Sequence, residues 1–166
     1  MSNANYPVML FALARSANAR RILEIGAGPE GGSGKTFASA LPEGGELWSV
    51  DINTSHPPEE VRAATEAEFK ITWRVLHGDS LTVPLDALGA NFDLLYIDGD
   101  HGGDHALGDF RRYAPLVRPG GLVVYDDFGM GSGVNHAITT LAAEGRQGIP
   151  LTYNTYDGNA HYVIRV

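Results

Sequence analysis

Short apolar segments alternate with longer mixed segments along almost the whole chain. Two of the short segments, Leu94–Ile97 and Leu122–Tyr125, are hydrophobic at every position, which is typical of strands covered on both faces of a parallel sheet. Each short segment is bounded by Gly, Asp or Pro, and this favours strands over helices. The pattern predicts five such strands: Arg21–Ala27, Glu46–Ile52, Ile71–Leu76, Phe92–Asp98 and Gly121–Tyr125.

The mixed segments predict helices, and the end of the chain predicts a hairpin. The expected helices are Pro7–Ala17, which leads the chain, Lys35–Leu41, Pro58–Phe69, Asp104–Leu116 and Val134–Gly145. Near the C-terminus, two strands are expected on either side of the turn sequence Asp157-Gly158-Asn159, namely Leu151–Tyr156 and His161–Val166. Crossover helices between parallel strands predict a doubly wound α/β fold. We expect residues 1–19 to lead into one domain over residues 20–166.

The composition supports one globular domain. The chain has 166 residues, of which 43% are hydrophobic and 19% charged, as in ordinary globular domains. No apolar run approaches the roughly 18 residues of a membrane span, and no signal-peptide pattern is visible. The absence of cysteine excludes disulfides, thiolate zinc sites and a Cys nucleophile, and it is compatible with a reducing compartment. We therefore expect a soluble, cytoplasmic protein.

The charge distribution argues against a nucleic-acid partner. The formal net charge is −8, and no cluster of Lys and Arg is larger than the pairs Arg20–Arg21 and Arg111–Arg112. A nucleic-acid-binding protein normally carries a basic stripe. The 21 glycines are unusually numerous, and many follow apolar segments, where turns and backbone contacts to a ligand occur.

The first predicted strand leads into a glycine-rich turn. Glu24-Ile25-Gly26-Ala27-Gly28 enters the loop Pro29–Gly34 before the next predicted helix. Glycines let the backbone approach a ligand, and a helix N-terminus offers free N–H groups to a negative group. The bland alternative is a plain turn between a strand and a helix. Asp51 ends the second strand 23 residues after Gly28, where a Rossmann-type site places a carboxylate for ribose hydroxyls; its alternative role is a turn residue or helix cap.

A second interpretation of the same region is a phosphate-binding P-loop. Gly34-Lys35-Thr36 resembles the end of that motif. The motif needs a glycine, four residues and then Gly-Lys-Thr, whereas Pro29 occupies the required glycine position. Proline also removes a backbone donor from the loop that should wrap the phosphates. A P-loop has no use for Asp51, so the sequence favours a nucleoside site.

The series of motifs at the strand ends resembles class I S-adenosylmethionine (SAM) methyltransferases. It comprises Glu24-x-Gly26-x-Gly28, Asp51, Gly78-Asp79-Ser80 and Asp98. A more specific series is similar to the small-molecule O-methyltransferase branch, methyltransferase family 24-like, that includes the cephalosporin-type and catechol-type metal-dependent enzymes. It comprises Ile97-Asp98-Gly99-Asp100-His101, Asp109, Pro119-Gly120-Gly121 and Tyr125-Asp126-Asp127-Phe128.

The resemblance implies a Rossmann-like fold, SAM as cofactor and a small hydroxylated substrate. It implies that SAM is bound by residues at the strand ends: Glu24, Gly26, Ala27, Gly28, Ser33, Asp51, Ile52, Gly78, Asp79, Ser80 and Asp98. Of these, Asp51 would hold the ribose, and Asp79 with Ser80 would contact the adenine side. The chain departs from the family pattern in its longer first loop, Pro29–Gly34, and in Gly102-Gly103, where an aromatic residue is common.

Three carboxylates are expected to meet at the ends of the fourth and fifth strands. Asp98 ends one, and Asp126 with Asp127 ends its expected neighbour. Such a group repels itself unless a cation or proton intervenes, and oxygen ligands suit Mg²⁺, Ca²⁺ or Mn²⁺. Successive strand residues point to opposite faces, so Asp126 and Asp127 converge on one ion only if the strand ends between them. The alternative is turn residues and a helix cap.

His101 is the candidate general base, because it follows Asp98 by three residues and could accept the proton of a hydroxyl group. It could instead contact SAM or cap the next helix. We interpret four further histidines as ordinary surface or core residues, namely His77, His105, His136 and His161.

Three functions therefore remain open. The leading one is SAM-dependent methyl transfer to a hydroxyl group, assisted by a divalent metal and by His101 and Asp98. The others are a P-loop NTPase or kinase that uses Lys35, and a SAM-binding module without catalysis. A homodimer is the default expectation for such a domain.

Overall fold

The sheet has the strand order that a doubly wound fold with a terminal hairpin requires. The computed structural model describes residues 5–130, 132–153 and 159–166. The described strands form one sheet in the order β3-β2-β1-β4-β5-β7-β6. They are β1 (Arg21–Ile25), β2 (Glu46–Asp51), β3 (Thr72–His77), β4 (Phe92–Ile97), β5 (Val117–Phe128), β6 (Gly148–Thr152) and β7 (Ala160–Arg165). Strands β1 to β5 run parallel, and β7 runs antiparallel to both β5 and β6.

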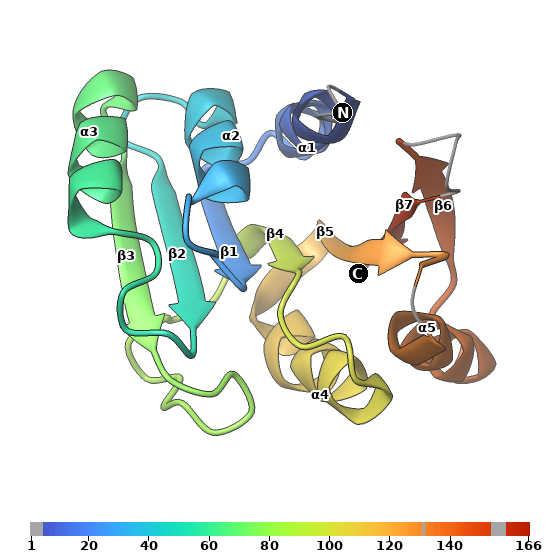
Figure 1. Ribbon diagram of the computed structural model, residues 1–166. Coiled ribbons are helices and arrows are strands. Elements are labelled where there is room, and N and C mark those ends of the chain that lie inside the picture. The colour runs from blue at the N-terminus through green and yellow to red at the C-terminus, as the bar shows by residue number, and fades with distance from the viewer. Residues whose placement is uncertain (1–4, 131, 154–158) are drawn as a thin grey trace.

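Helices cover both faces of this sheet. They are α1 (Asn5–Ser16), α2 (Gly32–Ala40), α3 (Glu59–Phe69), α4 (Gly103–Tyr113), which continues into a 3₁₀ turn over Ala114–Leu116, and α5 (Ser132–Ala143). Figure 1 shows α1, α2 and α3 on one side of the sheet and α4 and α5 on the other. Within the described parts of the chain, no helix has the length and apolarity that crossing a membrane requires.

The centre of the sheet is buried from both sides, as the uninterrupted apolar segments predict. Leu94, Leu95, Val123 and Val124 are all fully enclosed. One apolar cluster lies under α4 and α5, and a second lies under α1 and α2. The Rossmann-like α/β prediction is therefore confirmed.

Most predicted boundaries differ from the observed ones by one or two residues, and those of helix α2 and strand β5 differ by more. Helix α2 begins at Gly32 rather than Lys35, so the inserted loop is only Pro29–Gly31. The first turn of the helix was not predicted because glycine has a low helix propensity. Strand β5 spans Val117–Phe128 rather than Gly121–Tyr125. Its pairing with β4 is irregular between Phe92 and Leu94, so the Pro-Gly-Gly sequence bends the strand without ending it.

The terminal hairpin is present, with β6 beginning three residues before the expected Leu151. Asp157 and Gly158 of the predicted turn lie outside the described residues. Asn159 directly precedes β7, and its side-chain amide donates to Oδ1 of Asp127 at 2.9 Å. The hairpin therefore reaches the end of β5, where the predicted carboxylates lie.

Candidate functional site

A cavity of about 660 Å³ opens along the carboxyl ends of β1 and β2 and the loops after β3 and β4. This is the crevice where open α/β sheets bind ligands. Most of the residues predicted to bind a cofactor line it, namely Gly26, Ala27, Gly28, Ser33, Asp51, Ile52, Asp79, Ser80 and Asp98. Glu24 and Gly78, also predicted, are not among its lining residues.

Gly26 brings the first loop against the fourth strand. It has a φ of +89°, which residues with a side chain rarely adopt. A Cβ at this position would also overlap the backbone carbonyl of Asp98. The two loops that border the cavity therefore approach each other closely.

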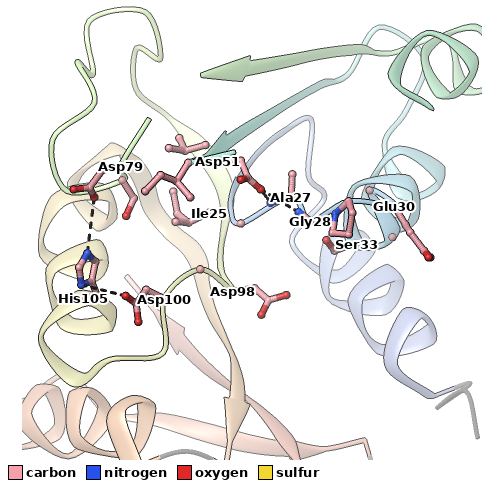
Figure 2. A pocket seen from close by; sticks show the side chains of 18 of the residues that line it. Ile25, Ala27, Gly28, Glu30, Ser33, Asp51, Asp79, Asp98, Asp100 and His105 are labelled. Atoms are coloured by element: carbon pink, nitrogen blue, oxygen red, sulfur yellow. Dashed lines mark hydrogen bonds and ion pairs between the residues drawn. The ribbon is translucent and has the colours of Figure 1, made fainter. Parts of the chain in front are cut away.

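Asp51 organises the glycine-rich loop from the end of β2. Its Oδ2 accepts hydrogen bonds from the backbone N–H of Ala27 at 2.9 Å and of Gly28 at 3.1 Å, and Figure 2 shows these contacts. Its Oδ1 accepts from the N–H of Asn53 at 2.8 Å. Asp51 therefore fixes the position of the loop and still lines the cavity.

Glu24 lies beneath the cavity rather than in it. Its side chain is fully buried, and its carboxylate accepts hydrogen bonds from Ser33 Oγ and, at 2.7 Å, from Ser49 Oγ. Burial raises the pKa of Glu24 to about 7, because the two hydroxyl groups only partly replace water. Glu24 thus supports Ser33, which does line the cavity.

His105 and Asp100 lie at the far end of the cavity and were not predicted as site residues. His105 Nδ1 lies 3.5 Å from Asp100 Oδ2, and its Nε2 lies 3.9 Å from Asp79 Oδ1 (Figure 2). Helix α4 begins at Gly103, which places His105 in its first turn, beside the strand ends. The predicted helix Asp104–Leu116 already placed His105 in its first turn, but the sequence did not show that this turn borders the cavity.

Tyr6 is a further lining residue that sequence reasoning missed. It comes from α1, and its hydroxyl lies 2.5 Å from that of Tyr96 on β4. Ninety positions separate the two residues, so no local pattern connects them. The leading segment therefore contributes a wall of the cavity.

A second group of polar side chains lies beside the cavity, at the ends of β4 and β5. His101 Nε2 lies 3.4 Å from Asp98 Oδ1, and His101 Nδ1 lies 3.2 Å from Asp127 Oδ2. One ligand atom from each residue lies within 4.8 Å of the other two. Burial raises the pKa of Asp98 to about 6, and the neighbouring carboxylates add to this effect while His101 opposes it. The pKa of His101 is raised, chiefly by its hydrogen bond to Asp98.

Asp126 points away from this group. Its carboxylate accepts hydrogen bonds at 2.9 Å from the hydroxyls of Tyr96 and Tyr153, and His161 Nδ1 lies 3.0 Å from Oδ1. Burial alone would raise the pKa of Asp126, but the hydrogen bond and charge of His161 outweigh it, and the pKa is lowered. Asp127 adopts a φ of +54°, so the two side chains leave the backbone toward different partners. The structure therefore brings Asp98 and Asp127 together with His101, and it places Asp126 behind them.

The family assignment follows from comparison with known proteins. Residues 23–128 match the family described as "Methyltransferase domain". The chain belongs to this family. Caffeoyl-CoA O-methyltransferase 2 of Zea mays is 34% identical over 134 residues, which are 76% of this chain and 48% of that protein. The O-methyltransferase TomG of Streptomyces achromogenes, solved in complex with SAM, is 28% identical with a TM-score of 0.69, over 98% of this chain and 79% of TomG.

Another solved structure supports the methyltransferase-domain fold alone. The O-methyltransferase of Bacillus cereus, solved in complex with SAH, has a TM-score of 0.74 at 22% identity. The match covers 98% of this chain and 80% of the Bacillus cereus chain. The chain spans 27%, 52% and 48% of the length of three curated relatives that it matches. The activity and substrates of this methyltransferase-domain chain are therefore matters for a proposal.

The P-loop interpretation does not fit the geometry of this methyltransferase domain. Lys35 lies within α2 and faces a separate hollow against Glu60 and Glu68 of α3. A Cβ at Gly34 would overlap the ring of Trp73. The glycine therefore serves the packing of α2 on the sheet, and Lys35 is not among the residues that line the cavity.

Proposed function

We propose that the chain is a SAM-dependent O-methyltransferase that acts on a hydroxyl group of a small molecule. The observation that carries this proposal is the juxtaposition of the cavity with the group Asp98, His101 and Asp127. Asp98 belongs to both, because it lines the cavity and lies 3.4 Å from His101. Methyl transfer needs this arrangement, since the donor sulfur and the acceptor oxygen must meet in one place.

The cavity has the polarity that the parts of SAM require. The loop Gly26–Gly28 and Ser33 would contact the methionine part, and Asp51 in the middle would accept from ribose hydroxyls, because a carboxylate keeps acceptor capacity after three backbone bonds. Ile52 is 75% exposed although it is apolar and lines the cavity. A large apolar side chain left open in this way is suited to cover the face of a nucleobase.

The group Asp98, His101 and Asp127 fits a divalent cation. The carboxylates of Asp98 and Asp127 would hold the ion, with His101 beside them and one atom of each of the three residues within 4.8 Å of the other two. Burial, and after it the nearby carboxylates of Asp126 and Asp127, raises the pKa of Asp98, and a cation would offset both effects. Carboxylate oxygens are ligands that suit Mg²⁺ or Mn²⁺. When bound, the ion would lower the pKa of an acceptor hydroxyl. Asp126, predicted as a third ligand, would support the site from behind.

His101 is the residue we assign to remove the proton of the acceptor. Its side chain is 41% exposed, so an acceptor can reach the ring. The carboxylates of Asp98 and Asp127 stabilise the positive charge that the ring gains with the proton. In the neutral form the ring can donate to one carboxylate and present its other nitrogen to the hydroxyl.

The proposal is tested with methyl-labelled SAM and a panel of catechols, phenols and sugar hydroxyls, with Mg²⁺ or with EDTA. We expect label in the product, about 10²-fold less with His101→Ala, and unchanged SAM binding with Lys35→Ala. Binding of SAM without label transfer to any acceptor would favour the non-catalytic module. Absence of SAM binding would contradict the proposal altogether.

A further inference from the structure

Strand β5 carries one extra residue at the place where its two adjacent aspartates lie. Tyr125 pairs with Tyr162 of β7, and Phe128 pairs with Ala160, so three steps along β5 match two steps along β7. Such a β-bulge re-aims side chains and is common next to active sites. The two aspartates fall inside the bulge, and their carboxylates therefore meet different partners.

The bulge leaves Asp127 in a conformation that has to be held. Its φ is +54°, and a residue with a side chain keeps such a backbone only where its surroundings fix it. Asn159, which directly precedes β7, provides a contact of this kind. Its side-chain amide donates to Oδ1 of Asp127 at 2.9 Å, across 32 positions of the chain.

The orientation of the Asn159 amide is fixed by the hairpin itself. Its Oδ1 accepts the backbone N–H of Ala160 at 3.0 Å, so the NH₂ group is the part that faces the carboxylate. The backbone carbonyl of Asn159 accepts the N–H of Tyr153 at 3.2 Å, and this bond ties Asn159 to the residue that follows β6. The amide is thus in place before any ion binds, which lowers the entropic cost of binding.

The contact with Asn159 determines where the second oxygen of Asp127 points. While Oδ1 is held by the amide, Oδ2 lies 3.2 Å from His101 Nδ1. Rotation about the Cβ–Cγ bond would turn Oδ2 away from the ring, and the amide opposes this rotation. Because an amide carries no charge, it orients the carboxylate without neutralising it. The negative charge of Asp127 stays available to a cation beside Asp98.

We infer that Asn159 is a positioning residue that directs Asp127 toward the cation and His101. The inference rests on the proposed cation site and deepens it, because it gives the terminal hairpin a part in that site. From the sequence, Asn159 was expected only in the hairpin turn. Loss of a residue that orients a metal ligand typically lowers metal affinity by about 10- to 100-fold.

The inference is tested by titration of the full chain with Mn²⁺ alone, with the EPR signal of the free ion as the readout. We expect Asn159→Ala to bind Mn²⁺ at least about tenfold more weakly than the wild type. Asn159→Gln keeps the amide donor on a longer side chain and should recover part of the loss. Both variants should bind S-adenosylhomocysteine with the wild-type affinity, since Asn159 is not among the described residues that line the cavity.

Asn91→Ala is the matched control, because Asn91 is exposed, directly precedes β4 and lies at the opposite edge of the sheet from Asp98. Its φ of +64° means that alanine there costs some stability, but the variant should bind Mn²⁺ as the wild type does. An equal loss of Mn²⁺ affinity in Asn91→Ala and Asn159→Ala would therefore overturn the inference.

Two further outcomes would also overturn it. If Asn159→Ala keeps the wild-type Mn²⁺ affinity, or Asn159→Gln binds no better than Asn159→Ala, the amide does not position Asp127, and the proposed function stands. If the wild type binds no Mn²⁺, the cation site and the inference fail together, and label transfer in EDTA then decides whether methyl transfer itself stands.

Discussion

Glu24 carries a carboxyl group into the interior with only two hydroxyl groups to solvate it. Its pKa of about 7 lies above the ordinary 4.5. The folded protein therefore keeps a proton that the unfolded chain releases between these two values. Because the folded state binds more protons there, stability falls as the pH rises from about 4.5 to 7 and stays reduced above that.

Glu24→Gln should remove this dependence. Below pH 4 the wild type and the variant should have nearly the same free energy of unfolding. Above pH 7 the variant should be more stable by up to roughly 3 kcal/mol, since one pKa unit is worth about 1.4 kcal/mol. Urea unfolding at several pH values measures the difference. A difference that is constant over the whole pH range would show that Glu24 is not the titrating group.

Site residues could be predicted from the sequence where a short motif directly follows a recognisable strand. Gly26 and Asp51 follow strands that could be recognised from their apolar residues, so their places at the cavity could be predicted. Asp126 and Asp127 could not be separated in this way, because their divergence depends on the left-handed conformation of Asp127. The sequence shows only two adjacent aspartates.

The elements of the fold meet at the glycine-rich loop, where β1 leads into α2. Gly26→Ala should destabilise the protein by about 3 kcal/mol, because strain at a positive φ adds to overlap with the Asp98 carbonyl. Gly44→Ala is the matched control, with a φ of +77° and open space around it, and it should cost only about 1 kcal/mol. Equal losses in thermal unfolding would exclude the close approach of the two loops.

The hairpin and β5 are joined through the buried carboxylate of Asp126. Tyr153→Phe removes a hydroxyl donor to this charge and should cost about 2 kcal/mol, since hydrogen bonds to charged groups are the stronger ones. Tyr125→Phe removes a hydroxyl donor to the backbone carbonyl of Ala106 and should cost about 1 kcal/mol. Denaturant unfolding compares them, and a larger loss for Tyr125→Phe would mean that Asp126 is not held as a charged group.

The central strands β4 and β5 could be predicted because their apolar runs are buried on both faces of the sheet. The edge strand β3 is only partly buried, and its short segment between turn residues was enough to indicate it. The start of α2 could not, because Gly32, Ser33 and Gly34 have low helix propensity. Tertiary contacts hold this turn, since Gly34 packs against Trp73 and Ser33 donates to the buried Glu24.

Tyr6 and His105 were missed for a related reason. Both line the cavity because of how α1 and α4 pack on the sheet. This packing depends on contacts between residues that are distant in the chain.

The molecule as a whole should bind one nucleoside, in the cavity between the glycine-rich loop and α4. Two structural features support its location: the Asp51 contacts to the loop and the exposed Ile52. Helix α1 closes one side through Tyr6.

Calorimetric titration of the wild type with S-adenosylhomocysteine tests this claim most directly. We expect one site per chain with micromolar affinity, unchanged by Lys35→Ala, and no binding of MgATP. Binding of MgATP that Lys35→Ala abolishes, with no heat from S-adenosylhomocysteine, would contradict it.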